Sequence, residues 1–190
     1  NSLDTFTGPL GKGWTHTYTI TLSYISNASL ILTEGDGKRV KYISSDGITY
    51  MPEDRFSEVS FITKTPDNTF TLRKKNGTVW TFSSDARLAS ITDRNNNRTT
   101  LTYTNGEITS ITDPYDRTAT LTYTSGKLTS IKDPLLREYT LSYTGDFLTS
   151  ITDPEAGKTM YTYDANNRIL SVQGPNSGIT AYDYEAQGRL

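Results

Sequence analysis

Cysteine is missing from this 190-residue sequence, histidine occurs once, and methionine occurs twice. Without cysteine the chain can form neither a disulfide nor a thiolate metal site. The 19 basic residues are scattered among 21 acidic ones, so the chain carries no basic stripe of the kind that binds nucleic acid and no polybasic patch for a membrane surface. We therefore expect no nucleic-acid partner.

Long apolar runs are lacking too. Hydrophobic residues make up 34% of the chain, and no stretch approaches the roughly 18 apolar residues of a membrane helix. We expect no membrane span. The first residues do not read as a signal peptide, and both ends read as cut, which we interpret as a piece of a longer protein.

Tyrosine and threonine occupy many of the positions at which a chain with a dense apolar core would have aliphatic residues. It holds 13 tyrosines, and Thr, Tyr, Ile and Val are the residues that suit a pleated, half-solvated surface. Proline and Asn-Gly pairs interrupt the extended runs, and no stretch predicts a long helix. The composition favours an all-β protein whose sheet has one solvated face.

Two short phrases recur with a nearly constant period, which is the signature of stacked supersecondary units. The first phrase recurs every 20 residues, with a weaker copy 21 residues after the fourth, at Ser90–Asp93, Ser110–Asp113, Ser130–Asp133, Ser150–Asp153 and Ser171–Gly174. The second lies between these copies, at Leu101–Thr104, Leu121–Thr124, Leu141–Thr144, Tyr161–Asp164 and Tyr182–Glu185.

Each unit holds two β-type runs and two turn signals. Asn105-Gly106 predicts a type I′ hairpin turn, because that turn needs positive φ at both central residues; the equivalent pairs are Ser125-Gly126, Gly145-Asp146 and Asn166-Asn167. Asp-Pro pairs at residues 113, 133 and 153 end the second run, since proline gives no N–H to a ladder. The prediction is an antiparallel meander of β-hairpin repeats of about 20 residues, forming a curved or spiral sheet.

The facing of the apolar residues leaves two alternatives. Tyr103 pairs with Ile108 across the two-residue turn, but Ile111 lies three positions further and alternation puts it on the opposite face. Either a β-bulge shifts the phase of the strand in every unit, or the second face of the sheet is also partly covered. We favour the second alternative.

Residues 1–85 lack the strict period but keep the same alternation of short strands and turns. Only Met51–Phe56 could hold a helical turn. We expect residues 1–85 to form a β-meander that caps the array, and residues 86–190 to form the hairpin repeats, truncated at the C-terminus. An uncapped strand edge invites pairing with another chain, so we expect the chain alone to form an edge-mediated oligomer or to fray after about residue 175.

Candidate sites reduce to two repeated positions. The repeat tyrosines should stack along one face and fix its register, with glycan or peptide binding as the less favoured alternative: Tyr103, Tyr123, Tyr143, Tyr163 and Tyr184. The turn aspartates lie two strands apart, too far to share one ion, so an Asx-type turn explains them better than a metal site: Asp93, Asp113, Asp133 and Asp153. Basic residues that follow four or five positions later could form ion pairs with them.

No arrangement of residues predicts catalysis. His16 is read as a strand histidine near Trp14, because nothing like a nucleophile elbow accompanies it. We assign no catalytic, cofactor-binding or metal-binding residue and expect no enzyme activity.

The segments Tyr182–Leu190 and Tyr161–Ile169 resemble the Y-x-Y-D-x-x-G-R-L motif of the RHS/YD-repeat family. Leu10–Tyr18 resembles the G-x-G-W-x-x-x-Y segment that precedes the repeats in such proteins. Earlier copies depart from the motif, because Tyr103, Tyr123 and Tyr143 are followed by threonine. The resemblance covers nearly the whole chain.

This resemblance implies a β-sheet that winds into a hollow shell, in bacterial toxins around a C-terminal toxic domain. The self-cleavage segment of that family lies beyond the last repeats and has no match here. The expected function is a non-catalytic structural module of a secreted or cell-surface bacterial protein. Its expected partners are the rest of its own polypeptide, including an enclosed toxin domain, with a glycan or cell wall as a further candidate contact. The alternative function is a carbohydrate- or protein-binding surface module.

Overall fold

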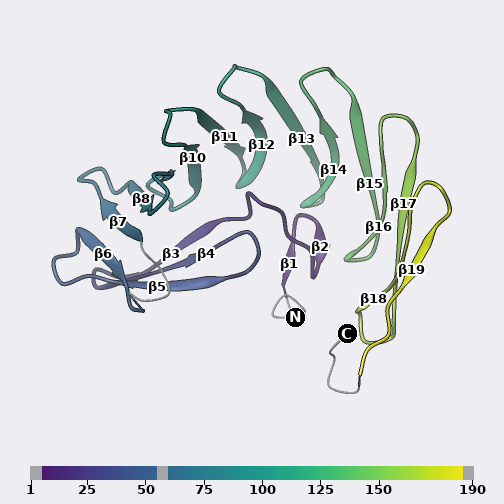
Figure 1. Cartoon of the computed structure of the whole chain (residues 1–190), viewed down its shortest axis with the longest axis horizontal. Coiled ribbons are helices and arrows are strands. Elements are labelled where there is room, and N and C mark those ends of the chain that lie inside the picture. Colours follow the sequence, from purple (N-terminus) through teal and green to yellow (C-terminus); the bar gives the residue numbers. More distant parts are fainter. Residues whose placement is uncertain (1–5, 55–59, 186–190) are drawn as a thin grey trace. The chain divides into compact units, whose positions relative to one another are not determined.

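Antiparallel strands joined by short turns make up the computed structural model, which describes residues 6–54 and 60–185 (Figure 1). Every helix or strand element in this described part is a β-strand. Neighbours along the chain pair with each other, as in a meander. The predicted all-β class and the antiparallel hairpin meander are therefore confirmed.

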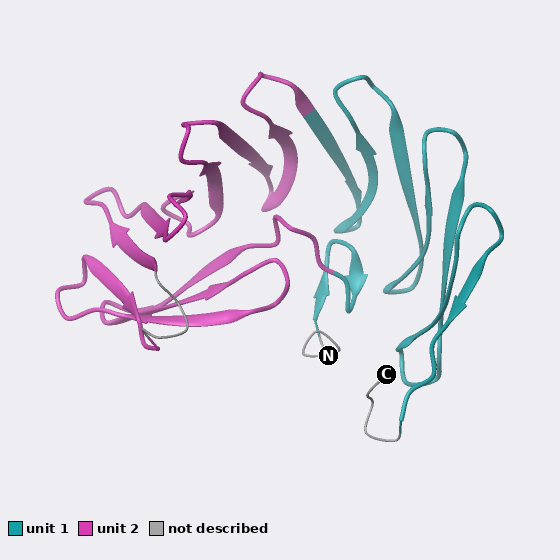
Figure 2. Cartoon of the chain, viewed as in Figure 1, with its two compact units in different colours: residues 1–14, 119–190 teal, residues 15–118 magenta. Residues whose placement is uncertain are grey.

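The chain divides into two compact units (Figure 2). Unit 1 comprises residues 1–14 and 119–190, and unit 2 comprises residues 15–118. The boundary at 85/86, which the onset of the strict period predicts, stays a prediction. The first ten strands, in chain order, are β1 (Thr7–Gly8), β2 (Gly11–Lys12), β3 (Thr21–Ser26), β4 (Ser29–Thr33), β5 (Arg39–Ile43), β6 (Thr49–Pro52), β7 (Ser60–Lys64), β8 (Phe70–Lys74), β9 (Val79–Phe82) and β10 (Leu88–Thr92). The remaining strands are β11 (Arg98–Thr104), β12 (Glu107–Thr112), β13 (Thr118–Thr124), β14 (Lys127–Lys132), β15 (Glu138–Thr144), β16 (Phe147–Thr152), β17 (Lys158–Tyr163), β18 (Ile169–Gln173) and β19 (Ile179–Ala181).

The core of unit 2 lies on the concave side of a curled sheet. An isolated bridge pairs Thr21 with Arg87, which brings the start of β3 beside the turn that precedes β10. Directly paired residues share a face, and the inward pairs are apolar: Leu72 faces both Ile62 and Trp80. The most buried side chains of this face are Leu30, Leu32, Tyr42, Tyr50, Ile62, Leu72, Phe82 and Leu88. The curvature predicted for the sheet is present in this unit.

The repeat hairpins turn alternately through two kinds of connection. The shorter kind is the predicted two-residue turn, in which Thr104 pairs with Glu107. Asn105 and Gly106 both have positive φ, 53° and 90°, as a type I′ turn requires. A turn of this kind also joins β13 to β14, where Ser125 and Gly126 both have positive φ. The turn between β15 and β16 is likewise two residues long, but of its central residues only Gly145 has positive φ, 57°.

The longer connection is a five-residue turn. Its hydrogen-bond pattern could not be predicted from the sequence. The residue at its first position donates its N–H to the carbonyl of the fifth and accepts from the N–H of the fourth, as Asp113 does with Arg117 and Asp116. The fourth residue has positive φ, 60° at Asp116. A type I turn followed by a left-handed residue has this geometry. It already occurs at Glu34–Lys38 and Lys74–Thr78, so the turn of the repeats extends into the first half of the chain.

Asn166-Asn167 is a correction to the predicted turns. These residues lie inside a five-residue turn, because Asp164 donates its N–H to the carbonyl of Arg168 and Tyr163 pairs with Ile169. The corresponding pair in the previous unit, Tyr143 and Leu148, encloses one residue fewer. The longer tip accounts for the spacing of 21 residues at this point in the sequence.

A β-bulge in every hairpin overturns the favoured interpretation of the apolar offset. Tyr103 pairs with Ile108 and Thr102 pairs with Ser110, so Thr109 has no partner across the ladder. The extra residue brings Ile111 opposite Leu101, on the same face as Tyr103 and Ile108. The second face therefore does not receive these residues. The same shift occurs between β9 and β10, β13 and β14, β15 and β16, and β17 and β18.

Two further expectations concern single segments. Met51 and Pro52 belong to strand β6, so they do not start a helical turn; Arg55 and Phe56 lie outside the described residues.

The last strand, β19, pairs with β18 beyond residue 175. Edge-mediated oligomerisation stays a prediction.

Candidate functional site

Each β-bulge disrupts the ladder of main-chain hydrogen bonds, so that one carbonyl lacks its regular partner. The hydroxyl groups of the repeat tyrosines point at these carbonyls. The residue before the bulged position is Leu88 in β10, Leu128 in β14 and Leu148 in β16. All three leucines are almost fully buried. A buried carbonyl without a partner costs free energy, so the fold needs a donor at each of these places.

The tyrosine hydroxyl of the following unit supplies that donor. Tyr103 donates to the Leu88 carbonyl at 2.9 Å, and Tyr143 donates to the Leu128 carbonyl at 2.7 Å. The separation is 15 residues each time. The same bond recurs from Tyr163 to Leu148 at 2.7 Å and from Tyr184 to Ile169 at 2.8 Å. Tyr123 occupies the equivalent register position, opposite Leu128. We call this contact the tyrosine–bulge hydrogen bond.

The tyrosine rings lie along one face of the hairpins at intermediate exposure. Burial raises the pKa of Tyr103 to about 12, and burial likewise raises the pKa of Tyr143 to about 12. Burial is also the first cause that raises the pKa of Tyr163, against a hydrogen bond from Trp14 that lowers it. These hydroxyls are therefore protonated donors at neutral pH.

Alkaline titration should reveal the tyrosine–bulge hydrogen bonds. Because the pKa of Tyr103 in the folded state, about 12, exceeds the ordinary value of 10.0, the contribution of its phenol to stability is complete below pH 10. That contribution is lost as pH rises through about 12. We expect the urea midpoint to fall between pH 10 and pH 12, and to fall less in Tyr103→Phe. A midpoint that does not change over this interval would contradict the prediction.

The predicted turn aspartates lie at the first position of the five-residue turns. In two of the turns the carboxylate accepts the N–H groups of the second and fourth residues that follow and also binds an arginine: Asp113 with Arg117, and Asp133 with Arg137. The Arg117 and Arg137 ion pairs are both 2.6 Å long. Asp153 accepts main-chain N–H groups in the same way.

Asp93 varies the pattern, because the side-chain amide of Asn97 takes the place of arginine at 2.8 Å. This amide is the first cause that lowers the pKa of Asp93, and the Arg117 guanidinium is the first that lowers the pKa of Asp113. Asp164 was missed in the sequence, although it follows Tyr163 and binds Arg168 at 2.7 Å. The Y-x-Y-D motif, in which Asp164 is the final residue, is the sequence signal that could have identified it.

Metal-binding and membrane-spanning groups were sought among the described residues. In residues 6–54 and 60–185, no three His, Asp or Glu side chains gather as a metal site. The same part of the chain contains no helix with the length and apolarity needed to cross a bilayer.

His16 lies in a turn, which corrects its placement in a strand. Its Nδ1 accepts the N–H of Tyr18 at 3.2 Å, and its main-chain carbonyl accepts the N–H of Thr19. Burial lowers the pKa of the imidazole. His16 lines a pocket of about 450 Å³ in unit 2, together with Ile20, Glu34, Trp80 and other residues.

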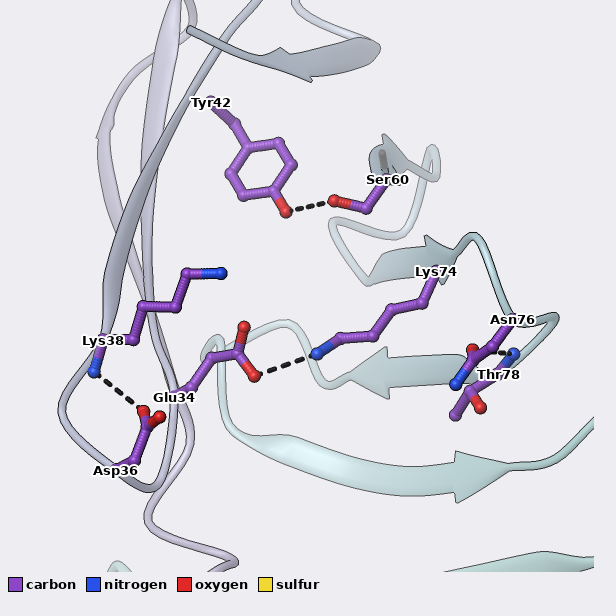
Figure 3. Close-up of polar contacts among 8 residues, drawn as sticks. All are labelled: Glu34, Asp36, Lys38, Tyr42, Ser60, Lys74, Asn76 and Thr78. Atoms are coloured by element: carbon purple, nitrogen blue, oxygen red, sulfur yellow. Dashed lines mark hydrogen bonds and ion pairs between the residues drawn. The ribbon is translucent and has the colours of Figure 1, made fainter. Parts of the chain in front are cut away.

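The acidic side of this pocket is tied to strand β8. Lys74 forms an ion pair with Glu34 at 2.9 Å (Figure 3), and its ammonium lies 3.8 Å from the centre of the Trp80 ring. Figure 3 also shows Asp36 accepting the N–H of Lys38 in the adjacent turn. Because Glu34 already has a partner, the geometry indicates a structural connection between two turns and shows no pairing of a nucleophile with a base.

Comparison with known proteins places the repeats in a family. The teneurin YD-shell family matches residues 55–190, and a domain of unknown function, DUF6531, matches residues 1–42. No curated protein matches the chain. Among solved structures, a crystal structure of TcdB2-TccC3-Cdc42 is similar over 87% of this chain, with 12% sequence identity and a TM-score of 0.44. The present chain spans 11% of the length of that chain. Because the YD-shell match extends over more than half of the sequence, the chain belongs to the teneurin YD-shell family and is an RHS/YD-repeat protein.

Proposed function

We propose that this chain is a segment of shell wall, whose function is to build an extended β-sheet that encloses space. The main support for this proposal is the tyrosine–bulge hydrogen bond, which recurs at Tyr103, Tyr143, Tyr163 and Tyr184 and joins each hydroxyl to a main-chain carbonyl 15 residues earlier. A hairpin alone is marginally stable in water. Stacking repeats through identical contacts lets the wall extend by addition of equal units.

The apolar face of the hairpins supports the same function. Leu121, Leu128, Leu141 and Leu148 are buried, while the residues between them on the other face, such as Thr122 and Ser142, are exposed. A sheet with this asymmetry separates two environments. The wall would surround another part of its own polypeptide, a toxin domain if the protein follows the toxins of the RHS/YD-repeat family, in a secreted or cell-surface bacterial protein.

A carbohydrate-binding role for the repeat tyrosines has less support. The hydroxyl groups of four of them, which would bind a sugar, donate to main-chain carbonyls at 2.7–2.9 Å: Tyr103, Tyr143, Tyr163 and Tyr184. A ligand would have to replace a bond that the fold requires. We therefore assign these tyrosines a structural role in the wall.

Deletion of whole and half repeats tests the proposal. Removal of residues 101–120 joins Thr100 to Leu121 and preserves the alternation of bulge and tyrosine, so we expect a chain that still unfolds cooperatively. Removal of residues 101–110 leaves one strand without its hairpin partner, and we expect loss of the cooperative transition. Circular dichroism during urea unfolding measures both. Equal loss of folding in the two deletions would refute a wall made of interchangeable units.

A further inference from the structure

The N-terminal segment Phe6–Trp14, here called the strap, belongs by its contacts to the repeat array of unit 1 (Figure 2). Strands β1 and β2 form a small hairpin in which Gly8 pairs with Gly11, and Gly13 closes it by donating its N–H to the carbonyl of Phe6. The residue after the strap, Thr15, belongs to unit 2. The strap thus belongs to unit 1, while the chain that follows it directly belongs to unit 2.

Main-chain hydrogen bonds attach the strap to two hairpins of the array. The N–H of Leu128 donates to the carbonyl of Pro9 at 2.8 Å, and the N–H of Lys12 donates to the carbonyl of Asp146 at 2.8 Å. The hydroxyl of Tyr143 also reaches the Pro9 carbonyl, at 3.4 Å. The two main-chain bonds hold the strap in place without depending on the side chains at Pro9 and Lys12.

Gly11 sets the closest approach. A Cβ atom at this position would lie 2.4 Å from the carbonyl oxygen of Asp146, and φ is +88°. Both observations require glycine, because no L side chain fits that space or adopts that conformation without strain. The contact with Asp146 is therefore specific for glycine at position 11, and this is the first feature that selects the strap.

Trp14 is the second feature that selects the strap. Its indole N–H donates to the hydroxyl of Tyr163 at 2.8 Å, and its ring packs edge-on against Tyr161 with centroids 4.9 Å apart. Both tyrosines lie on strand β17, and Tyr163 simultaneously forms its own tyrosine–bulge hydrogen bond. An aromatic anchor with one polar atom satisfied is the usual source of binding energy in such contacts.

We propose that residues 127–163 form a peptide-docking site, and that a second copy of this chain can occupy it with its own strap. The ligand is the hairpin segment that ends in Gly-Lys-Gly-Trp, recognised by the two main-chain bonds, by the space reserved for Gly11 and by the tyrosines that contact Trp14. Exchange of an identical element between copies needs no new contact, which makes it an inexpensive route to association. The strap of the same chain fills the site at ordinary concentrations because its effective concentration is in the millimolar range.

A full-length chain carrying Gly11→Ala tests the proposal, since this change blocks its own strap and leaves the docking site intact. The probe is a fluorescent peptide of residues 6–14. We expect the peptide to bind Gly11→Ala at least about 100-fold more tightly than it binds the wild-type chain, where the attached strap competes. The same peptide with Trp14→Ala should not bind. If Gly11→Ala does not fold, Trp14→Ala in the full-length chain serves to open the site in its place.

Mixing the opened variant with wild-type chain tests the second copy as partner. Because the wild-type strap must leave its own site to occupy the opened one, sedimentation velocity is run at chain concentrations in the millimolar range. We expect a heterodimer that excess peptide dissociates and that Gly11→Ala does not form alone. A folded Gly11→Ala chain that binds neither peptide nor wild-type chain would overturn the proposal. Peptide binding without a heterodimer would overturn the assignment of a second copy as the partner.

Discussion

Leu72→Ala is expected to lower the free energy of unfolding by about 2–5 kcal/mol. Leu72 lies at the centre of the unit 2 core, between Ile62 on β7 and Trp80 on β9, and its side chain has no solvent exposure. Removal of three carbon atoms there leaves a cavity that paired strands cannot close without shifting register. Urea unfolding followed by tryptophan fluorescence measures the change.

Leu135→Ala is the matched control, because it removes the same atoms from a side chain that is 75% exposed at a hairpin tip. We expect its free energy of unfolding to stay within about 0.5 kcal/mol of the wild type. Similar losses in the two variants would show that the inward-facing residues of β3 to β10 do not form the core described above.

Tyr143→Phe should lower the free energy of unfolding by about 1–3 kcal/mol although it removes a single oxygen atom. The change keeps the ring and deletes the donor that satisfies the Leu128 carbonyl. Leu128 itself is 2% exposed, so water cannot easily replace the lost partner. The cost is therefore larger than that of an ordinary exposed hydroxyl.

Tyr115→Phe is the appropriate comparison, since this tyrosine lies in the turn after Pro114 and is 77% exposed. It should have almost no effect on the urea midpoint. If Tyr143→Phe is equally silent, the tyrosine–bulge hydrogen bond is not what connects one repeat to the next, and the proposed wall loses its main support.

The hairpins could be predicted because their signals are local. Asn105-Gly106 sets a two-residue turn through its own φ angles, and the repeat period fixes how often such turns occur. The Leu/Ile-x-x-Ile offset also indicated that something breaks the alternation. Sequence alone did not favour a bulge, because the extra residues are Thr109, Thr129 and Thr149, which carry no glycine-like signal.

The acceptors of the tyrosine hydroxyls could not be predicted for the same reason. Their positions follow from the bulge, so an error in facing hides the contact between Tyr103 and the Leu88 carbonyl. The strap was hidden by distance: Trp14 and Tyr163 are 149 positions apart, and nothing local in either segment indicates the other. His16 was misplaced because its turn depends on the hydroxyl of Thr19, an ordinary residue in an alternating run.

The tyrosine–bulge hydrogen bonds all point the same way, from a later residue to a carbonyl made 15 residues before it. During translation, each hairpin leaving the ribosome therefore meets an acceptor that has already emerged, and the array can be assembled from its first repeat onward while synthesis continues. The strap is the exception. It is made before the repeat array, yet Trp14 has to wait for Tyr163, so its docking reports that strand β17 has been made.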